Sequence, residues 1–262
     1  LVYKAFNWEP PFFAHLPTIL ASDKSKLSKR HGAASILQYR SLGFLNQAML
    51  NFLALLGWSL DDKTDILDSE QLAENFSLER VIKSAAMFST DKLIWMNGYY
   101  IRNATREELA NMLLDYWNRY PPLEIPALPK KNYLLKLIPL VQERLKTLKD
   151  AAPLLHFLFK KKIDYQIGDL VQKGMDAKNT LLVLQESSTV LDEISSFSSG
   201  EIEDKLRGLS ETLGFKLGQL LGVLRVAVTG QKVAPPLFQT LEVLGQRRTG
   251  INLDVTKASA EH

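Results

Sequence analysis

The chain has 262 residues, of which 46% are hydrophobic and 23% charged, the balance of a globular protein with about two domains. Its 32 basic and 29 acidic residues leave a formal charge of +3, so any nucleic-acid surface must be a local concentration of cations. The sequence contains no cysteine, which excludes disulfides, thiolate metal sites and a cysteine nucleophile. This composition agrees with a cytoplasmic location.

The most apolar stretch, residues 48–58, is far shorter than the roughly 20 residues that a membrane-spanning helix needs. We therefore expect a soluble protein with no membrane partner. The chain begins at Leu1 without the charged and apolar regions of a signal peptide, so we expect it to start inside a longer protein.

Apolar spacing after residue 41 is helical almost throughout. Three helical faces are expected from Leu45, Met49, Phe52, Leu53 and Leu56, from Leu217, Leu220, Leu221, Leu224 and Val228, and from Leu237, Leu241 and Leu244. A glycine follows each face and is expected to end the helix: Gly57, as a left-handed cap, Gly230 and Gly245.

Helix starts are indicated by polar side chains at capping positions. Thr105 with Glu108, and Ser198 with Glu201, have the spacing of a capping box, in which each side chain bonds the other residue's free backbone N–H. Ser77 and Asp68 are further expected caps.

Few segments depart from the helical pattern. The proline-rich residues 120–129 cannot continue a helix, and we interpret them as a connection between helices or a domain edge. Residues 18–21 are the one short run with strand propensity.

Four cations gather between residues 24 and 30, namely Lys24, Lys26, Lys29 and Arg30. Such a cluster suits a polyphosphate, and Gly32 would let the loop approach it closely. A short basic run alone is more often a solvated surface loop, so the neighbouring residues decide. Residues 26–33, Lys-Leu-Ser-Lys-Arg-His-Gly-Ala, follow Phe-Ala-His-Leu-Pro at residues 13–17. Together they resemble the second signature loop of class I aminoacyl-tRNA synthetases, in the form found in bacterial-type glutamyl-tRNA synthetases.

The resemblance continues beyond the loop. Residues 51–58 and 91–102 are similar to the domain that follows the loop in this family, and residues 225–230 and 235–245 to its terminal helical domain. It implies a mainly α fold: a remnant of the class I catalytic region with a stem-contact helical domain, then an all-helical anticodon-binding domain in two subdomains. The expected boundaries are 1–105, 106–165 and 166–262.

The resemblance implies an ATP-dependent ligase that forms glutamyl-adenylate and transfers glutamate to tRNA(Glu), with tRNA(Gln) as a second candidate partner. Lys29 and Lys26 match the motif's catalytic lysines, and Lys29 would stabilise negative charge on the transferring phosphates. Lys26, Ser28, Lys29 and Arg30 would together bind ATP. ATP, with Mg, is the implied substrate, and we expect no metal to be bound by this chain itself.

Four side chains are candidates for tRNA binding. Tyr99 and Arg102 combine a ring with a cation and lie in a region that faces tRNA in the family, although a packed helix end explains them equally well. Residues 142–149 resemble the segment that precedes the anticodon-reading region of the family, and Arg144 within them can donate two parallel bonds to a base edge. Lys161 lies in the lysine run 160–162, for which a solvated surface is the alternative.

One departure from the family limits the expected activity. The family's first signature, a motif with histidine and glycine, has no counterpart in this sequence, and the glutamate pocket would lie upstream of it. We therefore expect the chain to be inactive alone, and to meet ATP and glutamate through the preceding half.

Two alternatives stay open: a noncatalytic helical RNA-binding or interaction protein, and a glutaminyl-tRNA synthetase. The helical period of the last hundred residues disfavours the second, whose anticodon domains are typically β-barrels.

Overall fold

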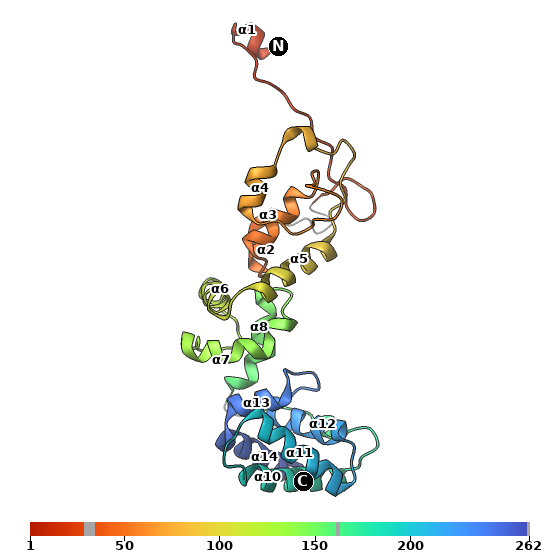
Figure 1. The fold of residues 1–262 in the computed structure, drawn as a ribbon, viewed down its shortest axis with the longest axis vertical. Helices are drawn as coiled ribbons and strands as arrows, with labels where there is room; N and C mark the ends of the chain where they lie inside the picture. The colour runs from red at the N-terminus through yellow and green to blue at the C-terminus, as the bar shows by residue number, and fades with distance from the viewer. Residues whose placement is uncertain (29–34, 161–162, 261–262) are drawn as a thin grey trace. The chain divides into compact units, whose positions relative to one another are not determined.

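The computed structural model describes residues 1–28, 35–160 and 163–260, and the chain divides into two compact units, Leu1–Tyr100 and Ile101–His262 (Figure 1). The described residues form fourteen α-helices and no extended strand, which confirms the mainly α fold. Leu20, in the expected strand-like run, makes only isolated bridges to Lys26 and Met87. The unit boundary falls inside one helix, and each unit is described by itself.

The first unit is built from short helices around a small core. Its elements are α1 (Val2–Ala5), α2 (Ile36–Ser41), α3 (Asn46–Ala54), α4 (Ser69–Asn75), the 3-10 helix η2 (Leu78–Arg80) and most of α5 (Thr90–Asn103). Helices α3 and α4 pack together, and Trp58, Leu67 and Leu72 form a buried cluster. The rings of Phe52 and Phe88 meet edge to face, 4.9 Å between centroids.

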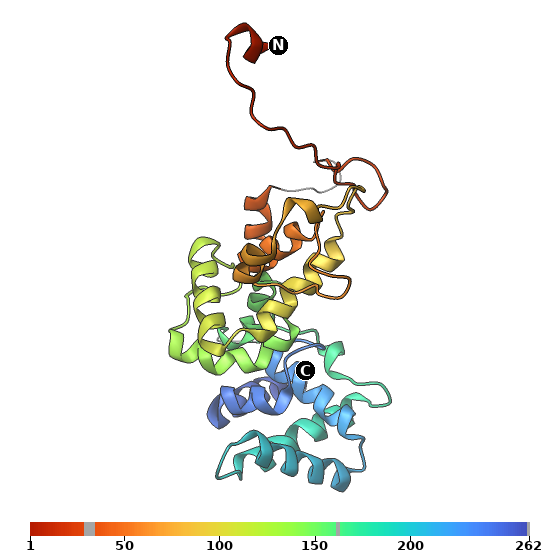
Figure 2. The ribbon, with the colours of Figure 1, turned by 45° about the horizontal axis from the view of Figure 1, so that its top comes forward.

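The second unit contains the remaining helices, and Figure 2 shows those from α10 onward gathered into one bundle. Its α-helices are α6 (Arg106–Arg119), α7 (Lys131–Val141), α8 (Ala151–Leu155), α9 (Ile167–Leu170), α10 (Ala177–Asp192), α11 (Ser199–Leu213), α12 (Leu217–Thr229), α13 (Leu237–Leu244) and α14 (Gln246–Ala260). Its 3-10 helices are η3 (Gln142–Arg144), η4 (Leu148–Asp150) and η5 (His156–Leu158). Helix α6 packs on α7, and α10 packs on α11 and α14.

Two of the expected helix starts are confirmed in full. Ser77 precedes η2, but its side chain makes no capping hydrogen bond, so it is wrong as a side-chain cap. Thr105 and Glu108 form a complete capping box at α6, and Asp68 forms another with Gln71 at α4. At α11 only half of the predicted box is present. The Ser198 side chain accepts a hydrogen bond from the backbone N–H of Glu201, whereas the N–H of Ser198 donates to the carbonyl of Ser196 at 2.6 Å. The proline-rich residues 120–129 connect α6 to α7, as predicted.

Of the three expected helix ends, two are confirmed and one is wrong. Gly245 directly follows α13, with φ of 79°. Gly230 ends α12 in the left-handed conformation, with φ of 71°. Gly57 does not: α3 ends at Ala54, and Gly57 has no positive φ. The N–H of Leu56 donates to the carbonyl of Leu53 at 3.2 Å, so a tightened last turn satisfies that end without a left-handed residue.

Within the described ranges, no single helix is long and apolar enough to cross a membrane. The pair α11 and α12 meets the length and composition requirement only together, and its two helices are bent by 119°.

Gly230, which follows α12, lies close to the backbone of Asp164, and Gly214, which follows α11, is the matched comparison. Gly230 and Gly214 are both left-handed, so alanine at either position costs about 1–2 kcal/mol of conformational strain. A Cβ on Gly230 would also lie 2.5 Å from the carbonyl oxygen of Asp164, whereas one on Gly214 meets nothing within 4 Å. We therefore expect Gly230→Ala to lower the free energy of unfolding by about 1 kcal/mol or more beyond Gly214→Ala, measured by urea denaturation. Equal losses of unfolding free energy in the two variants would mean that the short distance between Gly230 and Asp164 does not affect stability.

Candidate nucleic-acid interface

The turn that precedes the basic loop is held by its own backbone. The N–H of Ala21 donates to the carbonyl of Ser25 at 2.8 Å, and the N–H of Leu27 donates to the carbonyl of Ile19 at 3.0 Å. The Asp23 carboxylate accepts hydrogen bonds from the N–H and Oγ of Ser25, at 2.9 and 2.7 Å. The loop therefore starts from a closed turn.

The structure places only part of the predicted ATP-binding set. Lys26 is exposed and Ser28 half-buried, directly after the turn, in which Lys24 has a left-handed φ of 66°. Lys29 and Arg30 lie outside the described residues. The exposed ammonium of Lys26 is in a position to meet a phosphate from solution.

Helix α5, which carries Tyr99 and Arg102, is anchored by buried polar groups. The Asn97 side chain is fully buried and accepts from the N–H of Leu45 at 2.8 Å. The Tyr100 hydroxyl lies 3.0 Å from Oδ1 of Asn51 and 2.9 Å from the carbonyl oxygen of Leu67. These bonds fix both the height and the rotation of α5 against α3 in the first unit.

The hydroxyl of Tyr100 is kept in its donating form. Burial raises its pKa, and the Asp68 carboxylate and the Tyr99 phenol raise it further. Beside it, the half-buried Tyr99 ring has its centroid 5.9 Å from that of Tyr100 and 6.4 Å from that of Trp95. Tyr99 is thus a supported, partly exposed ring of the kind that stacks on a base.

The carboxyl end of α5 is covered by a side chain from η3. Nε2 of Gln142 donates to the carbonyl oxygens of Ile101 (3.0 Å), Arg102 (3.2 Å) and Ala104 (2.8 Å). The last carbonyls of a helix have no partner within the helix, and an amide with two hydrogens can serve three of them only through a shared bond. Gln142 therefore sets where the half-buried Arg102 leaves the helix.

Arg144 is two residues further along, at the end of η3, and its side chain is exposed. Its Nη1 donates to the carbonyl oxygen of Ala234 at 2.6 Å, a residue buried between α12 and α13. A guanidinium has five N–H donors in a planar fork, so this one bond orients Arg144 and leaves donors for a base edge.

Lys161, the fourth predicted RNA contact, lies outside the described residues. Its neighbour Lys160 forms a 3.1 Å ion pair with Asp164, four residues further along the chain. Ion pairs this exposed contribute little to stability.

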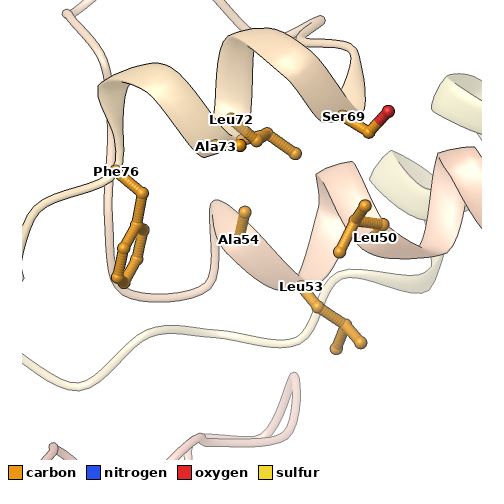
Figure 3. A pocket seen from close by; sticks show the side chains of 7 residues that line it. All are labelled: Leu50, Leu53, Ala54, Ser69, Leu72, Ala73 and Phe76. Atoms are coloured by element: carbon orange, nitrogen blue, oxygen red, sulfur yellow. The ribbon is translucent and has the colours of Figure 1, made fainter.

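An apolar pocket of about 590 Å³ lies between α3 and α4, and Figure 3 shows how its side chains converge. Its lining residues are Leu50, Leu53, Ala54, Ser69, Leu72, Ala73 and Phe76. This lining carries no charged side chain, so the pocket does not suit a phosphate.

The candidates form separate local sites. Lys26, Ser28 and Tyr99 belong to the first unit, and Arg102 and Arg144 to the second, where Gln142 joins the backbone of Arg102 to η3. Sequence reasoning missed Gln142, because a glutamine two residues before an arginine is an ordinary surface pattern. Only its distant acceptors reveal its role.

Two protein families match the chain. The family described as "tRNA synthetases class I (E and Q), catalytic domain" matches residues 1–95. The family described as "Anticodon binding domain" matches residues 108–252. The second match covers α6 almost from its start through to α14.

Similar proteins agree with these families. The chain is 44% identical over 248 residues to a protein of Dehalococcoides mccartyi, and 45% identical over 251 residues to one of Roseiflexus castenholzii, both named Glutamate–tRNA ligase. Each match covers 95% of this chain and 51% or 50% of the relative, so the chain spans about half the length of these curated relatives. A crystal structure of a glutamate tRNA ligase from Elizabethkingia meningosepticum, in complex with its amino acid, superposes with a TM-score of 0.80 at 25% identity. That superposition covers 98% of this chain and 53% of the other.

The amide of Gln142 gives a test of how the candidate interface is built. Gln142→Met keeps the side-chain length but removes the donor to the end of α5, so we expect the free energy of unfolding to fall by about 1–3 kcal/mol. Gln185→Met, at an exposed position of α10, is the matched control and should change it by less than about 0.5 kcal/mol. Chemical denaturation measures the free energy of unfolding of both variants. If Gln142→Met lowered it no more than Gln185→Met does, Gln142 would not anchor the end of α5.

Proposed function

We propose that this chain, which belongs to the family of bacterial-type glutamyl-tRNA synthetases, is the part of such an enzyme that binds tRNA and completes the ATP site. The enzyme would ligate glutamate to tRNA(Glu) through glutamyl-adenylate, with tRNA(Gln) as a second candidate substrate. The anticodon-binding match over residues 108–252 is the observation that supports tRNA binding most directly. The proposal places this activity in the cytoplasm.

The contribution to adenylate formation would be electrostatic. Lys29, assisted by Lys26, would neutralise the charge that develops on the phosphates as glutamate attacks ATP. Ser28 and Arg30 would fix the loop and contact the nucleotide. Mg²⁺ would arrive bound to the phosphates of ATP.

The contribution to RNA binding would be divided among several contacts. Tyr99 would stack on a base or sugar, Arg102 and Lys161 would neutralise phosphates, and Arg144 would read a base edge of the anticodon. We also propose that the helical part consists of two subdomains, residues 106–165 and 166–262. Both would face the anticodon arm.

The chain itself can test the proposal. We expect residues 1–262 to bind tRNA(Glu) in a filter-binding assay, and the affinity to fall by about tenfold or more between roughly 50 and 200 mM salt, as two neutralised phosphates predict. No glutamyl-adenylate should form, because the first signature motif is missing from this sequence. A control RNA hairpin of equal length should bind more weakly. Equal binding of both RNAs, or adenylate made by the chain alone, would contradict the proposal.

The role of Arg144 is tested separately. Arg144→Gln should lower the discrimination between two tRNAs that differ at the contacted anticodon base by about 1–3 kcal/mol. Lys161→Gln should weaken binding of both tRNAs alike, because a phosphate carries no sequence. Dissociation constants for the two tRNAs measure both effects. Equal losses on both tRNAs for Arg144→Gln would reassign Arg144 to a backbone contact.

A further inference from the structure

The second unit uses the same three-residue pattern twice, Gln142-Glu143-Arg144 and Gln246-Arg247-Arg248. Like Gln142 at the end of α5, Gln246 covers the end of a helix, in this case α10. Its Nε2 donates to the carbonyl oxygens of Leu191 and Asp192, both at 3.0 Å, and of Ile194 at 3.2 Å. In both triplets the acceptors are the first, second and fourth residues of a four-residue stretch.

The arginines of the two triplets reach in opposite directions along the chain. Arg144 donates to the carbonyl of Ala234, 90 residues later. Arg248 donates through Nη1 to the carbonyl of Leu158, 90 residues earlier, at 2.6 Å. Its Nη2 donates to the carbonyls of Phe157 and Lys160, at 3.1 and 2.6 Å. The first triplet therefore holds the loop at Ala234, which precedes the second triplet in the chain, and the second holds residues 157–160, which follow the first. We call the pair of triplets the reciprocal clasp.

The bonds of Arg248 are the stronger half of the clasp. Its half-buried guanidinium serves three carbonyls, and the side chains of Phe157 and Leu158 are buried beneath it. Bonds from a charged donor are stronger than neutral ones, and the planar fork of arginine matches several acceptors that a lysine ammonium cannot serve together.

Further contacts join residues 230–234 to residues 153–164, and we call this contact region the seam. Nε2 of Gln231 donates to the carbonyl of Pro153 at 3.2 Å, and Gly230 lies directly against the backbone of Asp164. The loop that receives Arg144 at Ala234 thus also reaches back across the seam. Ala234 lies in the same loop between α12 and α13 as Gln231, which makes one of these contacts.

We propose that Arg248 is a positioning residue for base recognition by Arg144, a role that rests on the proposed function. An exposed arginine normally loses much side-chain freedom when it binds, and a bond already made to Ala234 removes part of that cost in advance. Arg248 keeps the Ala234 carbonyl within reach of Arg144 by clasping the seam from the opposite side. It touches no RNA itself.

The experiment is a double-mutant cycle in residues 1–262. Dissociation constants are measured for two tRNA transcripts that differ at one anticodon base, with the wild type, Arg144→Gln, Arg248→Met and the double variant. We expect each single variant to lower the ratio of the two constants by about tenfold, and the double variant to lower it no further than Arg144→Gln alone. Multiplicative losses in the double variant would overturn the positioning role.

The controls separate the possible failures. Arg247→Met removes the neighbouring exposed charge and should leave the ratio unchanged. Arg248→Lys should restore part of the ratio, and it replaces Arg248→Met in the cycle if circular dichroism shows that variant to be unfolded. The salt dependence of binding should be unchanged in either Arg248 variant, and a slope lower by about one would mean a direct phosphate contact and overturn the proposal. An unchanged ratio in Arg144→Gln would instead defeat base reading by Arg144, which is the failure of the proposed function.

Discussion

The constraint on which the second unit depends is the set of carbonyl groups left over where its helices end. Every helix leaves its last carbonyls without a partner in the helix, and a unit built from many short helices has many such ends. Gln142, Gln246 and Arg248 supply the missing donors from 38 to 91 residues away along the chain. The hydrogen bonds that satisfy the ends of these helices are therefore also the bonds that attach distant segments of the chain to them.

This arrangement explains why a partly buried charge is tolerated at Arg248. Removing a guanidinium from water is costly unless its donors find acceptors, and the three carbonyls at 2.6 to 3.1 Å supply them. The carbonyls gain equally, because each would otherwise lie unpaired beside buried side chains. A hydrophobic replacement would leave these acceptors without donors, so packing alone cannot substitute for the bond.

The features that could be predicted from the sequence are those whose partners are close along the chain. Thr105 and Glu108 are three residues apart, and Gly230 directly follows its helix, so spacing alone identified both. Gly57 was predicted wrongly because a tightened last turn at α3 competes with a left-handed cap, and the choice between them is not visible in the glycine. Arg144 came from family resemblance, but its bond to Ala234 could not be foreseen across 90 residues.

The same contacts decide which cations are available to RNA. A net charge of +3 is small, and several cations are already engaged: Arg207 with Glu203, Lys131 with Glu107 and Lys232 with Asp169. These exposed ion pairs contribute about 0–1 kcal/mol each, so a phosphate can replace the carboxylate at little cost. The hydrogen bonds from Arg248 to carbonyls are different, because breaking them would leave buried acceptors without a donor, which costs free energy. Under the proposed function, cations of the first kind would exchange partners when RNA arrives, whereas Arg248 would keep its three carbonyl partners.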